Sequence, residues 1–395
     1  PRTNVDYQAK KWLKLITNMS FTHTDSQTPS FDVDTWGSSG NLFYITNSIG
    51  AIYPLYVRNA DGSKKIENGR QIYDTNQTNF ARPSITGNAV RDNEYDRKQT
   101  FRDNFSGQWA AIVSPIVGLD LEANLSATAM NERYNALYST FGSANNVDGQ
   151  AELRHRRWFT VNQRYTASYD KTFGEHSINL LAGYEQYNYK YQRFYGYNDH
   201  LFDPFIGELT NAKGKSKMGL DSYTNNYMTE GFLGRVMYNY QGKYFVNASI
   251  RRDASSKFAP GHRWGTFGSF GLGWQINKEE FMKDYTWIDL LKLKLSYGSV
   301  GNDNLTDNWY PYADQYITSY NEETKDYSIK MDSKGNDELT WETHRDWNFG
   351  VDFGFLNNRI SGTLEYFHQT TIDLLWPKTI PLSSGLSVAD YYANI

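Results

Sequence analysis

Two stretches of the sequence place aromatic rings beside amide and carboxylate groups, a combination suited to binding sugars. Aromatic rings can cover the apolar faces of sugar rings, while Asn and Asp side chains hydrogen-bond the hydroxyl groups. The first stretch contains Trp36, Tyr44 and Tyr53. The second and denser stretch contains Asn302, Asp303, Asn304, Trp309, Tyr310, Tyr312 and Asp314. These residues are the predicted substrate-binding candidates. Packing of the loops on one another is the alternative role for the aromatic ones.

Other kinds of chemistry find little support in the sequence. The absence of Cys excludes disulfides, thiol catalysis and Cys-ligated metals. No His-Glu-x-x-His pair and no Gly-x-Ser-x-Gly elbow occurs, so no enzyme is predicted. The residues that could gather around Ca²⁺ are Asp303, Asn304, Asp307 and Asn308. Their spacing misses the EF-hand pattern, so a solvated polar loop is favoured and no cofactor or metal site is predicted.

The candidate loops must be held by the elements between them, which are predicted to be β-strands. In residues 119–130, Leu119, Leu121 and Leu125 fall on one face of a period-2 pattern. Asp120 and Glu122 fall on the other face. Such alternation is typical of a strand with one apolar side, and a helix would mix the two sets. The same pattern recurs in about eleven segments from 13–22 to 360–366.

The connections between these segments alternate in length along the chain. Short turns near 115–118, 171–175, 241–243 and 357–358 separate long connections such as 25–98, 193–229 and 301–343. Short periplasmic turns on one rim and long extracellular loops on the other are typical of an outer-membrane β-barrel. A soluble β-sandwich is the alternative fold, but its strands are usually about 5–6 residues long. Several segments here are longer, so an all-β transmembrane antiparallel barrel is predicted.

Composition agrees with a barrel in the bacterial outer membrane. Aromatic residues make up 16% of the chain, including 31 Tyr, 22 Phe and 11 Trp, as aromatic girdles at the two bilayer interfaces would require. The net charge of −4 indicates no nucleic-acid partner. No stretch approaches the roughly 18 apolar residues of a spanning helix.

A count of about eleven strands does not fit a complete barrel, because the number is odd. Bacterial single-chain barrels have even strand numbers and close on themselves, because an open edge in lipid leaves backbone groups unpaired. Doubling the number gives a 22-stranded barrel with a plugged lumen. Residues 1–395 are therefore expected to be part of one barrel domain, with the plug domain and the C-terminal strands outside this sequence. No signal peptide opens the chain, so its true N-terminus is also expected to lie elsewhere.

Four basic residues are predicted to point into the lumen, because they lie on the polar faces of their strands. They are Arg102, Arg164, Arg235 and Lys294. They could steer an anionic substrate, or pair with Glu122, Glu185 and Asp352 on neighbouring strands. Contact with carboxylates of a plug domain is the favoured interpretation.

Particular segments resemble the SusC/RagA family of TonB-linked outer-membrane proteins. They are RRDASSKF at 251–258, SFGLGW at 269–274 followed by EEFMK at 279–283, SYGSVGN at 296–302, and LTWE at 339–342 continuing through GVDFGF at 350–355 to TIDLL at 371–375. The resemblance is dense from about residue 230 to 395 and looser before that. Ala254 stands where the family usually has Gly, and Lys257 where Arg is common.

The resemblance implies a transporter driven by the TonB complex, with an N-terminal plug and a SusD-like surface lipoprotein that caps the extracellular mouth. Family substrates are mostly glycans, with a minority of peptides. The function expected from the sequence is therefore TonB-dependent import of oligosaccharides across the outer membrane. Some loop aromatics could then contact the lipoprotein lid. A peptide importer of the same family, a passive porin-like channel and, more distantly, a soluble all-β carbohydrate-binding protein are the alternatives.

Overall fold

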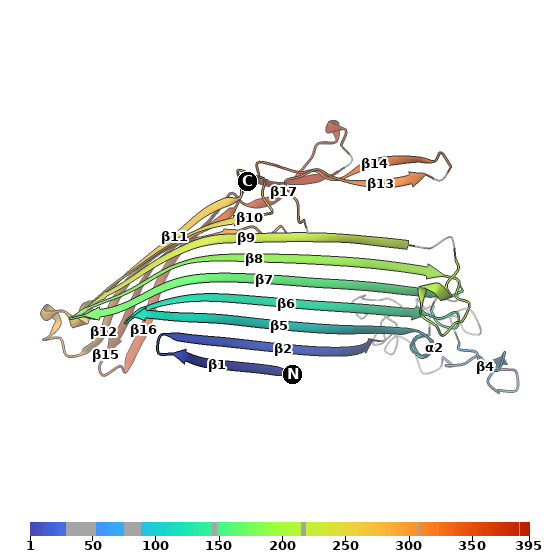
Figure 1. Cartoon of the computed structure of the whole chain (residues 1–395), viewed down its shortest axis with the longest axis horizontal. Helices are drawn as coiled ribbons and strands as arrows, with labels where there is room; N and C mark the ends of the chain where they lie inside the picture. The colour runs from blue at the N-terminus through green and yellow to red at the C-terminus, as the bar shows by residue number, and fades with distance from the viewer. Residues whose placement is uncertain are drawn as a thin grey trace.

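The protein is a strongly curved antiparallel sheet whose strands follow one another in chain order (Figure 1). The computed structural model describes residues 1–28, 53–74, 88–143, 148–214, 219–305, 308–321, 323–386 and 388–395. The sheet consists of β1 (Arg2–Lys10), β2 (Leu13–Thr28), β5 (Arg97–Ile116), β6 (Leu119–Tyr138), β7 (Gln150–Phe173), β8 (His176–Asp199), β9 (Gly219–Tyr240), β10 (Tyr244–Ser255), β11 (Trp264–Gln275), β12 (Ile288–Asn302), β15 (Glu342–Phe355) and β16 (Ile360–Ile372).

The remaining elements lie in the connections. They are the hairpins β3 (Ile66–Glu67) with β4 (Arg70–Gln71), β13 (Gln315–Asn321) with β14 (Asp326–Ser333), and β17 (Leu375–Thr379) with β18 (Asp390–Asn394), the helix α2 (Ala89–Tyr95), and the 3₁₀ turns η2 (Leu209–Asn211), η3 (Ile276–Lys278), η4 (Glu280–Met282) and η5 (Leu382–Ser384). None of the described helices is long and apolar enough to cross a membrane.

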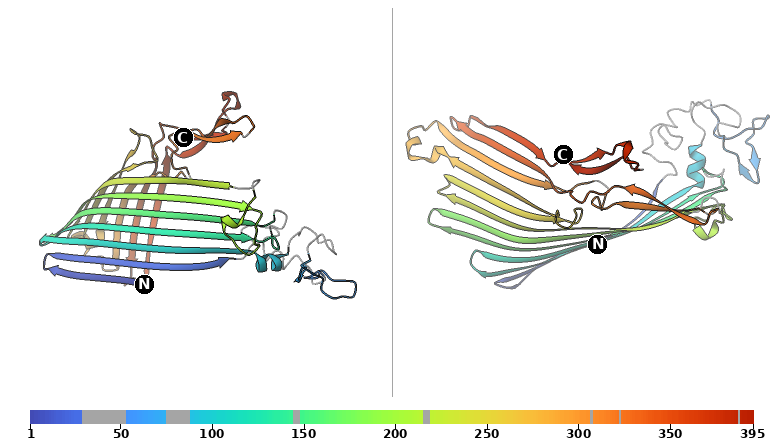
Figure 2. Two further views of the ribbon diagram at one scale, coloured as in Figure 1. Left: turned by 45° about the vertical axis from the view of Figure 1, so that its right-hand side comes forward. Right: turned by 90° about the horizontal axis from the view of Figure 1, so that it is seen from above.

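The sheet contains 12 strands, one more than the sequence pattern indicated. The additional strand is β1 (RTNVDYQAK), in which Val5, Tyr7 and Ala9 alternate with Asp6, Gln8 and Lys10, a short period-2 run that the prediction did not include. The described sheet curls into an open trough with β1 and β16 at its two edges (Figure 2). Ala254 lies within β10, opposite Trp264, so this position forms part of a ladder and does not need a glycine.

Short turns and long connections are sorted onto opposite rims, as predicted. One rim carries the tight turns after β1, β5, β7, β9 and β15, together with the β11–β12 connection. Gly118 shows how tight these turns are. Its φ is +87°, and a Cβ there would lie 2.2 Å from the carbonyl oxygen of Asp170. The other rim carries the long connections, including 303–341 between β12 and β15.

The outer face carries two belts of aromatic rings. Tyr184 stacks against Tyr165 and contacts Phe232, with ring centroids 6.4 and 5.1 Å apart. Nearer the short turns, the His176 ring lies 5.2 Å from Phe173 and 4.7 Å from Tyr240. Along β8, His176 and Tyr184 are separated by about 27 Å at 3.4 Å per residue. For strands tilted by about 35–45°, this separation corresponds to a height of about 19–22 Å, comparable to the apolar band of about 25 Å between two aromatic girdles.

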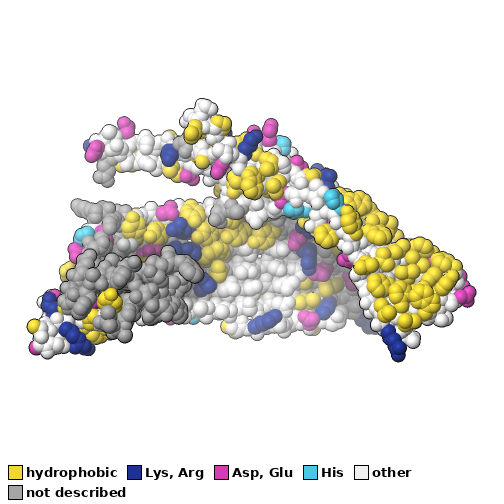
Figure 3. Space-filling model, turned by 180° about the vertical axis from the view of Figure 1, so that it is seen from behind, with side chains coloured by type: hydrophobic (Ala, Val, Ile, Leu, Met, Phe, Trp, Pro, Cys, Tyr) yellow, Lys and Arg dark blue, Asp and Glu magenta, His cyan; other side chains and the backbone are white. Residues whose placement is uncertain are grey.

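The outer and inner faces differ sharply between these belts. Leu180 and Ala182 lie on the outer face of β8, beside Val236 and Gly234 of β9. Hydrophobic side chains form a dense patch over one end of the molecule, whereas the hollowed face beside it is mostly polar (Figure 3). Beyond Tyr184 the outward positions of β8 become polar, with Gln186, Asn188, Lys190 and Gln192. The upper part of β8 therefore extends past the apolar band into water.

The position of the band predicts how charge on the outer face affects stability. Leu180→Arg in the full-length protein should destabilise the folded barrel by about 2–4 kcal/mol, because Leu180 lies midway between the belts. Asn188→Arg, on the same face of the same strand but beyond the band, should cost roughly 0–1 kcal/mol. Urea titration of folding into phospholipid vesicles measures both. Equal costs for the two variants would contradict this placement of the membrane.

A candidate substrate-binding cleft

Strands β7, β8 and β9 extend further towards the rim of long connections than β10 does, and their inner face is called the high wall below. Strand β10 ends opposite Thr229, while β9 continues to Gly219, so 219–228 has β8 on one side and no β10 residue on the other. Its exposed backbone is met by side chains of other connections. The amide of Met228 donates to Ser256 Oγ at 2.9 Å, and the amide of Asn226 donates to Tyr310 Oη at 3.2 Å. The long connection 303–341 is thereby held against the inside of the high wall.

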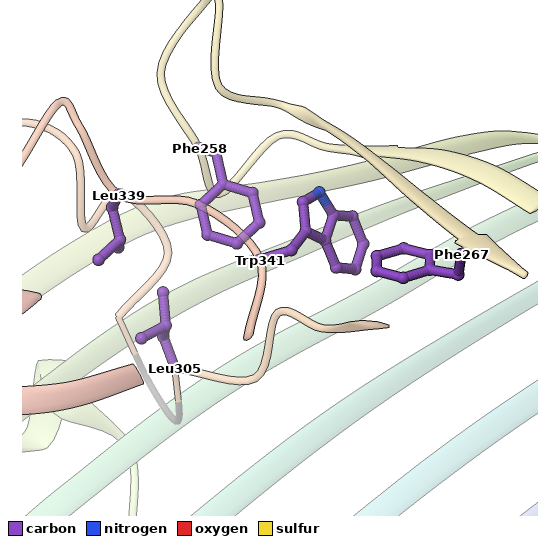
Figure 4. Packing of buried hydrophobic residues seen from close by; sticks show 5 residues of the cluster. All are labelled: Phe258, Phe267, Leu305, Leu339 and Trp341. Carbon is purple, nitrogen blue, oxygen red and sulfur yellow. The ribbon is translucent and has the colours of Figure 1, made fainter. Parts of the chain in front are cut away.

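A small hydrophobic cluster anchors both ends of this connection (Figure 4). Leu305 and Leu339, near its two ends, are 1% and 0% exposed and pack with Phe258, Phe267 and Trp341. The Trp341 Nε1–H also donates to the carbonyl of Arg263 at 2.7 Å. Burying a large apolar side chain contributes about 1.5–3 kcal/mol, so this cluster fixes the base of the connection firmly.

Several residues predicted to bind substrate instead form hydrogen bonds that hold the base of the connection 303–341. Asp303 accepts hydrogen bonds from the hydroxyls of Tyr227 at 2.7 Å and Ser255 at 2.6 Å. Asn302 donates to Glu342 at 3.0 Å, and its side-chain oxygen accepts from the amide of Asn304 at 3.0 Å. Their polar groups therefore bond within the protein and orient the start of the connection.

Trp309 and Tyr310, two further predicted residues, line a cavity of about 920 Å³ between the connection and the high wall. Trp309 stacks on Tyr189 of β8, with ring centroids 5.3 Å apart and planes 3° from parallel. Trp158 of β7 lies 5.3 Å from Tyr191, which lies 5.8 Å from Tyr223 of β9. The full lining is Trp158, Tyr189, Tyr191, Tyr223, Asn225, Asn308, Trp309, Tyr310, Gln315, Ile317, Asp332 and Ser333. This space is called the aromatic cleft below.

The residues on the wall side of the aromatic cleft were not predicted from the sequence, because binding residues were expected in loops. A usable signal exists in β8, where tyrosines stand at 187, 189, 191, 195 and 197, at alternating positions of one face. That face includes Glu185, which is directly opposite Arg164, and is therefore the inner one. The strand register brings Trp158, Tyr191 and Asn225 into one row across three strands. The cleft lies level with the polar outer positions of β8 and hence above the apolar band.

Other predicted residues lie elsewhere. Tyr312 belongs to the same connection but is outside the set of described residues that line the aromatic cleft. Tyr53 lies in the segment 53–74, which packs through Tyr73 against Tyr95 of α2. Trp36 and Tyr44 are outside the residues that the structure describes.

Asp314 links the two chain segments on either side of the β13–β14 hairpin. Its carboxylate accepts hydrogen bonds from Lys334 Nζ and from the amide of Gly335, each at 2.8 Å. These bonds, chiefly the one from Lys334, hold the pKa of Asp314 below its ordinary value of 3.8. The chain approaches itself closely here, since a Cβ on Gly335 would lie 2.3 Å from the carbonyl carbon of Ala313.

The four predicted inward cations all have partners within the wall. Three of them meet carboxylates, Arg102 with Glu132 at 2.6 Å, Arg164 with Glu122 at 3.5 Å, and Lys294 with Asp352 at 2.8 Å. Arg235 donates to the side chain of Asn179 at 3.1 Å. Pairing with neighbouring strands was the alternative role considered for these cations. Their contact with a plug domain stays a prediction.

No cluster of metal-ligating side chains is present among the described residues. Asp307, one of the four residues considered for Ca²⁺, lies outside the described part of the chain. The carboxylate of Asp303 accepts bonds from two hydroxyl groups instead.

Comparison with known proteins identifies the sheet. The family model described as "TonB dependent receptor-like, beta-barrel" matches residues 21–394. The chain belongs to the TonB-dependent receptor β-barrel family. The predictions of an outer-membrane antiparallel β-barrel and of its family are thereby confirmed.

Individual relatives of this receptor barrel agree with the SusC/RagA resemblance. The TonB-dependent receptor SusC of Bacteroides thetaiotaomicron is 27% identical over 283 residues, covering 68% of this chain and 27% of SusC. The TonB-dependent receptor P3 of Formosa agariphila is 26% identical, covering 98% of this chain and 37% of that protein. A structure of the RagAB peptide transporter superposes on the whole chain with a TM-score of 0.78 at 22% identity, covering 42% of its own chain, and supports the fold. The chain thus spans only about a quarter to two fifths of the relatives that it matches.

The ion pair of Asp314 leads to a pH-dependent prediction. Because the folded-state pKa of Asp314 is lowered, its stabilisation is present above pH 3.8 and is lost as the pH falls through the lower folded value. Asp314→Asn should therefore speed hydrogen exchange in 308–321 and 323–335 at pH 7, and the difference from wild type should vanish in strong acid. Asp326→Asn, at the other end of the β13–β14 hairpin, is the matched control. Unchanged exchange in Asp314→Asn at pH 7 would show that this contact does not hold the connection.

Proposed function

We propose that the chain is the substrate-recognising part of the barrel of a TonB-dependent outer-membrane importer of oligosaccharides. The observation that carries this proposal is the aromatic cleft, where rings from three strands and one extracellular connection surround a single space. Its volume falls within the usual range of about 300–1,000 Å³ for ligand sites. A position above the apolar band gives access from outside the cell.

The lining suits a sugar chain in particular. Trp158, Tyr191 and Tyr223 offer ring faces and edges to the apolar sides of sugars. Asn225 brings an amide donor and acceptor for hydroxyl groups. Asn308 brings only its amide NH₂ donor, because its Oδ1 already accepts from the Tyr310 amide and from Gln315 Nε2 at 3.1 Å each. Because Trp309 already stacks on Tyr189, a bound ring would either extend this stack or replace one member of it. The proposed function consists of binding and transport, and it requires no catalytic residue.

We further propose that the rest of the barrel lies beyond the edges of the described sheet. Residues 1–395 would form part of one barrel domain, with further strands pairing with β1 and β16 to remove two edges that are costly in lipid. A plug domain, a segment that contacts the TonB complex and a SusD-like lipoprotein lid would complete the transporter. The similarity to SusC supports these assignments.

Peptide import is the second candidate, since the RagAB structures are titled as a peptide transporter. The aromatic lining favours sugars, because Ile317 is the one aliphatic side chain among the described residues of the cleft. A peptide site would be expected to offer more aliphatic surface and backbone hydrogen-bond partners.

The cleft predicts a specific loss of affinity. Trp309→Ala in the full-length protein should weaken binding of a recognised oligosaccharide by about tenfold or more, through lost stacking and buried area. Tyr320→Ala is the matched control, because Tyr320 lies on the opposite face of the hairpin from Ile317 and contacts Tyr327 instead. Calorimetry with a panel of oligosaccharides and tetrapeptides measures both variants.

Uptake assays test the transport step separately. Cells expressing the full-length protein should accumulate the bound oligosaccharide, and deletion of TonB should abolish this uptake. Uptake that persists without TonB would favour a passive channel. Affinity for peptides alone, or an unchanged affinity in Trp309→Ala, would overturn the assignment of sugars to the cleft.

A further inference from the structure

A group of arginines lies on the inner wall immediately above the aromatic cleft. Arg156 and Arg193 are directly opposite each other on β7 and β8. Each is two residues along its strand from a lining residue of the cleft, Trp158 and Tyr191 respectively. Arg154 is the next inward residue on β7. These three residues are called the arginine group below.

The geometry of the arginine group is costly without an anion. Like charges directly opposite on one face of a sheet repel each other. The Nε atoms of Arg154, Arg156 and Arg193 are buried and have no hydrogen-bond partner among the described residues. A buried donor without a partner loses its hydration without compensation, and because these Nε atoms are inaccessible, a bound anion would offset that cost through the exposed part of the Arg156 and Arg193 guanidinium groups.

The carboxylates nearby satisfy this charge only partly. Glu132 is shared between Arg102 at 2.6 Å and Arg156 at 3.5 Å. Asp221 lies 3.7 Å from Arg193. The inward cations of this part of the wall are Lys98, Arg102, Arg154, Arg156 and Arg193, and the inward carboxylates are Glu132, Glu152 and Asp221. The cations outnumber the carboxylates on a chain whose net charge is −4, so this positive region is local.

Aromatic rings hold the guanidinium groups in place. Arg154 lies over the ring of Tyr134 at 4.5 Å, and Arg193 lies over Tyr195 at 5.1 Å and Tyr223 at 5.7 Å. Tyr223 also lines the aromatic cleft, so it contacts both the arginine group and any ligand in the cleft. The side chains of Arg156 and Arg193 are still 29% and 26% exposed, which leaves part of each guanidinium open to the hollow face.

We propose that the arginine group is an anion-binding subsite of the aromatic cleft, and that the substrate is an acidic oligosaccharide. This inference rests on the proposed function and adds the charge class of the substrate. A sugar ring stacked beside Trp158 and Tyr191 would direct its carboxylate or sulfate group towards Arg156 and Arg193. Arginine suits either group, because its planar fork of donors binds two oxygens at once.

The test compares charged and neutral ligands of equal length on the full-length protein in detergent. The probes are tetragalacturonate, a sulfated carrageenan tetrasaccharide, neutral maltotetraose and tetraglutamate, each measured by calorimetry. At least one of the two acidic oligosaccharides should bind more tightly than maltotetraose. The two acidic probes separate a uronate carboxylate from a sulfate ester as the recognised group.

Substitution of the arginines should remove this preference. Arg156→Gln/Arg193→Gln should weaken binding of the acidic oligosaccharide by about tenfold or more, as expected for lost charged hydrogen bonds. Its affinity for maltotetraose should be unchanged. Arg164→Gln is the matched control, since Arg164 lies on the inner face of the same strand but pairs with Glu122. Arg193→Lys keeps the charge and should retain part of the preference.

Folding of the double variant provides an independent check. Because this variant removes two like charges that lie directly opposite each other, its resistance to unfolding by urea should equal or exceed that of the wild type. Full retention of acidic-sugar affinity in this variant would overturn the anion subsite. The same result is expected if carboxylates elsewhere in the protein already pair with these arginines, and it would equally exclude a role for them in binding. Binding of tetraglutamate alone would assign the site to peptides and overturn the sugar proposal. If Trp309→Ala lost affinity while the arginine variants did not, the subsite would fail and the importer proposal would stand.

Discussion

The requirement that every backbone group be hydrogen-bonded inside the bilayer governs this structure. In hydrocarbon an unpaired N–H or C=O group costs several kcal/mol, so the membrane-spanning part must be a continuous ladder. Strands β5 to β9 satisfy this requirement with paired registers that run almost their full length. Such a ladder fixes which side chains face lipid and which face the hollow interior. The aromatic belts, the lumenal ion pairs and the inner rows of tyrosines all follow from that alternation.

Above the bilayer the constraint relaxes, and the proposed recognition surface lies there. Water can hydrogen-bond free backbone groups there, so β9 can extend beyond the end of β10. The unpaired backbone edge of β9 is partly covered by Ser256 and Tyr310. Three of the four segments that resemble the SusC/RagA family contribute residues at this step in the wall, whereas the fourth, 269–283, runs along β11 to the rim of short turns. Phe258, Leu339 and Trp341 form the hydrophobic anchor, and Asn302 bonds Glu342. These recurrent residues therefore position the connection 303–341, whereas the residues that line the cleft lie between and beside them.

Much of the fold could be predicted from the sequence, because period-2 alternation and sorted connection lengths are local properties. Strand β1 was not predicted, although Val5, Tyr7 and Ala9 alternate with polar residues, because this run is short and lies at the start of the chain. The site was predictable only in part. Trp309 and Tyr310 were found from composition, but their partners Tyr189, Tyr191 and Trp158 depend on the register of three strands and on the unequal height of the wall. Asp303 and Asp314 have the right chemistry for a ligand, yet they bond to hydroxyl, ammonium and amide groups of the protein itself. A single sequence does not reveal which polar groups the fold will use internally.

The absence of cysteine from these residues allows a direct test of whether the cleft lies above the apolar band. Single cysteines would be introduced at Leu180 and Lys190, which share the outer face of β8. Intact cells expressing the full-length protein would then be treated with a charged, membrane-impermeant maleimide. Position 190 should be labelled rapidly, whereas position 180 should not be labelled until the membrane is dissolved. Labelling of position 180 on intact cells, or protection of position 190, would contradict the membrane position and with it the extracellular cleft.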